Sequence, residues 1–211
     1  MISFVIYYLW FILYAMTWII IGLGNPGEEY ENTRHNTGRM ALEYAGKRLG
    51  AGEWKVNKAT KATVAKVSIG KTPIVFVLPD TFMNKSGAAA AKYVKSMKAA
   101  EHMIVVHDDL DLPLGSIKLS FNRGSGGHKG VESIARAVKT KKFTRIRIGV
   151  SRATAGGKIK KPAGEDEVID FILAPFKPAE LTELKTVFKK ATDAIETIVT
   201  EGPERAMNRF N

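Results

Sequence analysis

The chain has 211 residues, enough for one sizeable hydrophobic core but few for two complete domains. It contains no cysteine, which excludes disulfides, thiolate metal sites and a cysteine nucleophile, and with only four histidines it offers little for a structural zinc site. The formal net charge is +11 at pH 7, which directs attention to polyanionic partners.

The N-terminal stretch is unusual because its first 21 residues carry no charge, which is the length of a membrane span. Residues 18–23, however, are needed as the first strand of the domain, and residues 1–15 alone are too short to cross a bilayer. They also lack the basic region and cleavage site of a signal peptide. We expect residues 1–15 to be a start-site artefact or a disordered extension, with Met16 as the true start of a single domain over residues 16–211. A membrane anchor is the alternative.

Residues 19–39 organise the rest of the chain. An apolar run at 19–21 predicts a buried strand, and the turn GLGNPG at 22–27 ends it. Polar residues then lead to His35 and to a helix starting near Thr37. Because α/β proteins build sites where strands end, we expect Asn25 and His35 to face one crevice.

The same turn formally matches the dinucleotide-binding pattern of three glycines, but its chemistry argues against a nucleotide cofactor. Pro26 removes a backbone donor, and Glu28 and Glu29 stand where a pyrophosphate needs positive charge. A second phosphate-loop likeness, at residues 65–72, is followed at once by Pro73 and a strand. That pattern predicts a hairpin turn instead.

Strands and helices interleave along the remainder of the chain. Alternating or continuous apolar runs predict strands at 63–69, 74–78, 103–107, 117–121 and 145–150. Helices are predicted from about Ser86 to Lys98, after the glycine-rich loop 122–130, and from Pro178 to a stop at Gly202. Residues 108–111 and 152–165 are expected to be loops. We therefore predict an α/β fold: a single domain with a twisted mixed β-sheet flanked by helices on both faces.

The positive charge is concentrated in one part of the chain. Residues 112–164 hold thirteen Lys and Arg against one acid, Glu132, whereas the rest holds nineteen basic and twenty acidic side chains. In strand 145–150, Arg145 and Arg147 are expected on the face opposite the apolar residues. A field this localised favours a nucleic-acid partner over charge spread for solubility.

The polar residues at the predicted strand ends suggest hydrolysis. A histidine beside an aspartate is the minimum set for general-base attack of water on a carbonyl, and Asn side chains can position the water or donate to the oxyanion. No Gly-x-Ser-x-Gly elbow supports a serine nucleophile. A metal site is the alternative, but its candidate ligands show no recognised spacing. Those candidates are His35, His107, Asp108, Asp111 and His128.

Four blocks resemble the bacterial-type peptidyl-tRNA hydrolase family. They are GLGNPG at 22–27 with Tyr30 and TRHNTG at 33–38, then PDTFMNKSG at 79–87, HDDLDLP at 107–113 and GGHKG at 126–130. The likeness runs in order from about Thr17 to Pro203.

The resemblance implies cleavage of the ester that joins a peptide to the 3′ ribose of tRNA, without metal or cofactor. His35 would be the general base, Asp108 its catalytic partner and Asn25 a substrate contact. Tyr30, Phe82, Met83 and Asn84 would line the groove for the peptide and the 3′ end, and His128 and Lys129 would also bind substrate. Arg147, aided by Lys118, would hold tRNA phosphate. We expect a cytoplasmic monomer without a membrane or stable protein partner.

The chain departs from the family pattern at two positions. Lys129 stands where an Asn is frequent, and lysine can donate but not accept a hydrogen bond. The usual basic partner of Arg147 falls at Ser120, and Lys118 on the same strand face offers a substitute. An RNA-binding protein of this fold without catalysis is the alternative function, although the intact set of His35, Asp108 and Asn25 argues against it.

Overall fold

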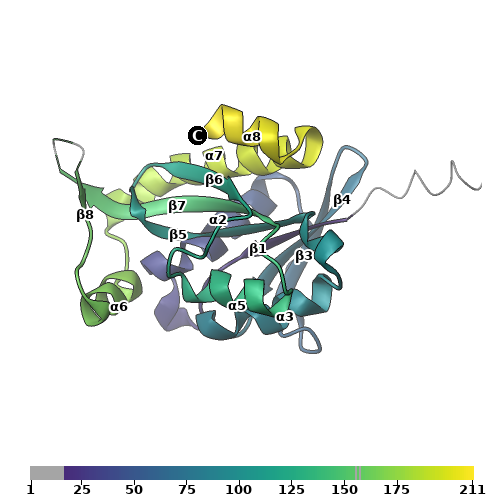
Figure 1. Cartoon of the computed structure of the whole chain (residues 1–211), viewed down its shortest axis with the longest axis horizontal. Coiled ribbons are helices and arrows are strands. Elements are labelled where there is room, and N and C mark those ends of the chain that lie inside the picture. The colour runs from purple at the N-terminus through teal and green to yellow at the C-terminus, as the bar shows by residue number, and fades with distance from the viewer. Residues whose placement is uncertain (1–16, 155, 157) are drawn as a thin grey trace, which may run out of the picture.

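A computed structural model describes residues 17–154, 156 and 158–211. Among these residues, eight strands form one mixed sheet in the order β2-β3-β4-β1-β5-β7-β6, with β8 paired to the end of β7 (Figure 1). Neighbouring strands β4, β1, β5 and β7 pair in parallel. The pairs β2–β3, β3–β4, β6–β7 and β7–β8 are antiparallel. The strands are β1 (Trp18–Gly22), β2 (Lys55–Asn57), β3 (Ala62–Ile69), β4 (Thr72–Pro79), β5 (Met103–Pro113), β6 (Ile117–Phe121), β7 (Thr144–Ala153) and β8 (Ile159–Lys160).

Helices cover both faces of this sheet (Figure 1). One face packs on α2 (Thr37–Arg48), α7 (Pro178–Glu201) and α8 (Pro203–Phe210), and the other on α3 (Ser86–Tyr93), α4 (Met97–Ala100) and α5 (Lys129–Ala137). Strand β1 lies between the two layers. Trp18 and Ile20 join the first core, and Ile19 and Ile21 the second, so the continuous apolar run is explained by burial on both faces. The predicted fold class is confirmed.

Two backbone segments approach each other closely where α2 begins. Gly38 lies in the first turn of this helix, against the ends of β1 and β5. A Cβ built on it would overlap the carbonyl oxygen of Val106 and lie 2.8 Å from the backbone nitrogen of Leu23. Only glycine fits there without moving backbone. This packing fixes the 3₁₀ turn η2 (Arg34–Asn36), which carries His35, against the sheet.

Several predicted boundaries are wrong. Strand β5 continues through Asp108–Asp111 to Pro113, because β7 pairs with it as far as Ser151 across a register shift. The predicted helix to Lys98 is two helices, since Val94 is extended and buried and Ser96 caps α4.

The expected loop at 152–165 is also replaced in part by regular structure. Arg152 and Ala153 pair with β8, and helix α6 (Glu165–Leu173) follows. The prediction for residues 1–15 lies outside the described residues. Within the described part, no helix combines the length and apolar character needed to cross a membrane.

We predict that Gly38→Ala destabilises the protein. The added methyl group must displace backbone of β1 or β5, which we expect to cost about 2–3 kcal/mol of unfolding free energy. Gly52→Ala is the matched control, because a Cβ there meets nothing nearer than the Lys66 carbonyl oxygen at 3.8 Å. Urea denaturation measures both. Equal midpoints for the two variants would contradict the packing argument.

The core also buries a histidine. His107 in β5 is inaccessible, and its Nδ1 donates to the carbonyl oxygen of Asp108 at 2.6 Å. Burial lowers the pKa of His107 well below 6.5, and His128 and Arg145 lower it further, against a smaller raising effect of Asp108. The native protein therefore holds His107 neutral.

We predict that the free energy of unfolding falls as the pH drops below about 6.5. Histidine in the unfolded chain becomes protonated there, whereas His107 in the native protein stays neutral. His107 changes the free energy of unfolding by at most about 1.4 kcal/mol per pH unit. Above about pH 6.5 its stabilising contribution is fully present. Urea midpoints between about pH 7.5 and 5 test this, and His107→Gln should flatten the dependence. His102→Gln is the control. The same slope in His107→Gln would contradict the assignment.

Candidate active site

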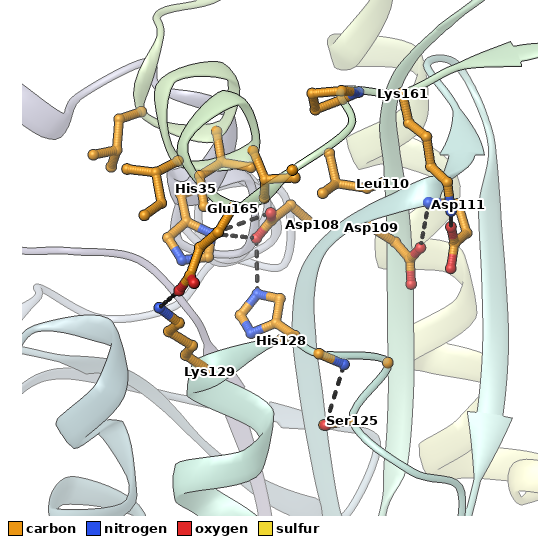
Figure 2. Close-up of a pocket in the computed structure, with 18 residues that line it drawn as sticks. His35, Asp108, Asp109, Leu110, Asp111, Ser125, His128, Lys129, Lys161 and Glu165 are labelled. Carbon is orange, nitrogen blue, oxygen red and sulfur yellow. Dashed lines mark hydrogen bonds and ion pairs between the residues drawn. The ribbon is translucent and has the colours of Figure 1, made fainter.

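The site is built around the carboxylate of Asp108, which is 3% exposed. Nδ1 of His35 lies 3.1 Å from both of its oxygens, and Nε2 of His128 lies 2.9 Å from Oδ1. Figure 2 shows the two imidazole rings approaching the carboxylate from different directions. The three side chains come from η2, β5 and the residue preceding α5, which are far apart in the sequence.

The two histidines keep Asp108 ionised. Burial alone would raise the pKa of this carboxyl, but charge interactions with His35 and His128 and the hydrogen bonds from both rings hold it well below its usual range. An ionised Asp108 accepts from the Nδ1–H of His35, which leaves the lone pair on Nε2 of His35. His35 lines an open cleft, and its Nε2 makes no hydrogen bond among the described residues.

The segment carrying His35 is tied to a distant part of the chain. Thr33 forms a β-bridge with Pro175, and the amide of Arg34 donates to the carbonyl of Ala174. The guanidinium of Arg34 donates to the Ala174 carbonyl at 3.1 Å and pairs with Glu180 at 3.0 Å. It also lies over an aromatic ring, that of Phe171, 4.5 Å from its centroid. These contacts hold the neighbouring His35 in place.

Asn25 is fixed beside the histidine segment. It exchanges two hydrogen bonds with Asn36, from its amide to Oδ1 of Asn36 at 2.8 Å and from Nδ2 of Asn36 to its carbonyl at 3.0 Å. Its own Oδ1 accepts from the amide of Met83 at 2.8 Å. The side-chain Nδ2 of Asn25 is thus left to donate elsewhere.

The other predicted groove residues gather around Asn25. Met83 is buried, while Phe82 is 56% exposed and meets Tyr30 edge-to-face at 6.4 Å. Asn84 is exposed in the same 3₁₀ turn as Met83. Half-buried Tyr30 and exposed Phe82 provide an apolar contact surface next to the fixed amide of Asn25, outside the cleft of His35.

The cleft has a wall that the sequence prediction missed. Helix α6 contributes Val168, Ile169, Ile172 and Leu173, opposite Asp108 and His128. The spacing i, i+1, i+4, i+5 of these apolar residues was the available signal for an amphipathic helix. The closing contact is the ion pair of Lys129 with Glu165, 3.4 Å between Nζ and Oε1, visible in Figure 2.

The basic residues form a second hollow beside the cleft. Arg147 and Lys118 are cross-strand partners on β7 and β6, and Nε of Arg147 lies 2.6 Å from Oδ2 of Asp109. Arg145, expected on an outer face, is only 4% exposed. It lines the hollow together with Arg123 and Ser120. Ser120 and Lys118 thus share this hollow, as the strand alternation predicts.

The five-residue metal alternative is not assembled. Of its members, His35, Asp108 and His128 offer ligand atoms within 4.8 Å of one another. Nδ1 of His128, however, accepts from the amides of Gly130 at 3.2 Å and Val131 at 3.4 Å, so its Nε2 carries the proton and has no lone pair for a metal. Asp111 instead pairs with Lys161 at 2.7 Å.

The chain matches the family model described as peptidyl-tRNA hydrolase over residues 19–211. A peptidyl-tRNA hydrolase of Paenarthrobacter aurescens is 40% identical over 188 residues, which cover 88% of this chain and 92% of that protein. The Aquifex aeolicus enzyme of the same name is 40% identical over 194 residues, 92% of this chain and 95% of its own. The crystal structure of peptidyl-tRNA hydrolase from Acinetobacter baumannii superposes with a TM-score of 0.81 at 28% identity, covering 93% of this chain and 95% of that one. With the family model matching nearly all of the described chain, the protein belongs to the peptidyl-tRNA hydrolase family.

Proposed function

We propose that this protein hydrolyses the ester between the peptide and the 3′ ribose of tRNA in peptidyl-tRNA, with His35 as general base. The observation that carries the mechanism is the bond from Nδ1 of His35 to ionised Asp108, which leaves Nε2 as a free acceptor in an open cleft. Family membership supports the substrate.

In this mechanism, Nε2 of His35 takes a proton from a water molecule as the water oxygen attacks the ester carbonyl carbon. Asp108 stabilises the imidazolium that forms. The tetrahedral intermediate then expels the 3′ oxygen of the ribose, which receives the proton from His35. The products are tRNA with its 3′ hydroxyl restored and a peptide carboxylic acid, which releases its proton to solvent.

Asn25 is proposed to bind the substrate carbonyl. Its Oδ1 is engaged by Met83, so its Nδ2 donates, and a donor aimed at a developing oxyanion lowers the barrier. Tyr30, Phe82 and Asn84 offer the adjoining surface for the peptide and the 3′ end. Lys129 would contact the substrate on the opposite side of the cleft.

The basic hollow is proposed to hold the tRNA backbone through Arg147 and Lys118, with Arg123 beside them. Because every proposed catalytic group comes from one chain, the enzyme is proposed to act as a monomer. Because peptidyl-tRNA forms during translation, the enzyme is proposed to act in the cytoplasm.

We predict that His35→Ala lowers kcat on an N-acylaminoacyl-tRNA by about 100- to 10,000-fold, since the general base is removed. Asp108→Asn should also lose activity, because an amide donating to Nδ1 would place the ring proton on Nε2 and block the base. Release of acyl amino acid from purified protein measures both, and His102→Gln is the control.

Binding and chelator measurements separate this proposal from its alternatives. His35→Ala should still bind tRNA, and hydrolysis by the parent protein should survive a chelator. Hydrolysis that persists in His35→Ala would exclude this mechanism. Parent protein that binds tRNA but releases no acyl amino acid would be an RNA-binding protein without catalysis, and loss of activity with chelator would favour a metal.

We predict that Lys118→Met weakens tRNA binding and leaves kcat unchanged. Removing one phosphate contact should reduce the slope of log Kd against log salt by about one. Lys71→Met is the matched control, since Lys71 lies in the β3–β4 turn, at the other end of the sheet from the basic hollow. Fluorescence anisotropy with labelled tRNA at several salt concentrations measures the slopes. An equal loss in both variants would count against a localised tRNA site.

A further inference from the structure

We propose that His128 is a positioning residue whose second ring nitrogen is occupied by the N-terminus of α5, and that its bond to Asp108 determines which of two histidines acts as the base. This inference rests on the proposed function. It replaces the expectation that His128 binds substrate.

Asp108 lies between two histidine rings, and both are chemically able to act as a base. His35 and His128 both bond to its carboxylate through one ring nitrogen, and their ring centroids are 5.0 Å apart. Two positively charged rings at this separation repel each other, so a proton taken from water must go to one of them. The difference between the two lies in the other ring nitrogen.

The second nitrogen of His128 is occupied by a helix. His128 is the N-cap of α5, and its Nδ1 accepts from the amides of Gly130 and Val131. Protonation of Nδ1 would set an N–H group against two N–H groups, remove the cap and place positive charge at the positive end of the helix. This geometry therefore favours Nε2 of His35, which is open, over Nδ1 of His128 as the atom that takes the proton from water.

Charged and titratable groups from four elements surround the ring of His128. The ring of His107 stands 4.6 Å away in an edge geometry, and His107 is itself fully buried. Lys129 follows on α5 and is paired with Glu165 of α6. Asp108 is the facing carboxylate, and it is already bonded to Nε2–H of His128. The charged and titratable groups around the ring are His35 from η2, His107 and Asp108 from β5, Lys129 from α5 and Glu165 from α6.

This arrangement has two consequences for His35. The bond from His128 fixes the Asp108 carboxylate, so that both oxygens stay 3.1 Å from Nδ1 of His35. It also draws electron density from the carboxylate, which makes Asp108 a weaker acceptor. Without this bond, Asp108 would hold the protonated form of His35 more tightly, and hydrolysis would need a higher pH.

Two substitutions separate capping from positioning. In His128→Asn the side chain still caps α5, because Asn is a strong N-cap, but it is too short to span the ring-length distance to Asp108. In His128→Gln the longer amide reaches Asp108 and donates, while the cap is weakened. Ser96→Ala, which removes the N-cap of α4 away from the site, controls for loss of a cap alone.

We predict that His128→Asn lowers kcat by about 10-fold with KM changed less than about 2-fold, and moves the acid limb of the pH–rate profile up by about half a unit. In His128→Gln the acid limb should lie at the same pH as in the parent protein, and most of kcat should be kept, despite a lower melting temperature. A rise in KM alone would identify His128 as a substrate ligand. Unchanged kinetics in His128→Asn would show that His128 serves only as the N-cap of α5. Either result overturns the proposal.

Nitrogen-15 NMR of the parent protein gives a test that is independent of activity. The ring of His128 should show the Nε2–H tautomer, because its Nδ1 accepts from the amides of Gly130 and Val131. The Nδ1–H tautomer, or an even mixture of the two tautomers, would overturn the proposal. If the parent protein releases no acyl amino acid, the proposed function fails, and the spectrum still decides the state of His128.

Discussion

A buried, ionised carboxylate is the constraint on which the site depends. Removing Asp108 from water carries a large desolvation cost, which only close donors can offset. The chain supplies two, His35 and His128, and it brings them from an irregular turn and from a helix cap. The sheet, the glycine that lets α2 approach it, and the cap of α5 all serve to keep two imidazole rings around one carboxylate.

Much of the fold could be predicted because the central strands alternate or run apolar over lengths typical of strands. The run at 19–21, the hairpin around Gly70 and the long helix after Pro178 all lie where periodicity placed them. The prediction ended strand β5 too early, because the three aspartates that follow His107 are typical of a loop. Their charges are tolerated within a strand because Asp108 meets two histidines, and Asp109 and Asp111 meet Arg147 and Lys161. Such partners belong to tertiary structure and are invisible in local sequence.

The candidate site divides in the same way. Asn25 and His35 could be placed in one crevice, because a strand end and the following turn define their position. The bonds of His128 could not be foreseen, since they depend on which ring nitrogen a helix terminus occupies. The apolar wall from α6 was missed because its short amphipathic pattern follows a stretch rich in glycine and lysine. Arg145 shows the same limit, because an alternating strand does not reveal whether its polar face is covered.

The anchor of Arg34 has a consequence for the timing of assembly. This side chain, next to His35, donates to the carbonyl groups of Ala174 and Pro175, which lie 140 and 141 residues further along the chain. A growing chain therefore carries His35, the proposed general base, long before it carries the groups that hold it. Contacts this distant form late, because the entropy of closing the loop must be met first. The segment of His35 is therefore held in place only after residues 174 and 175 have been synthesised.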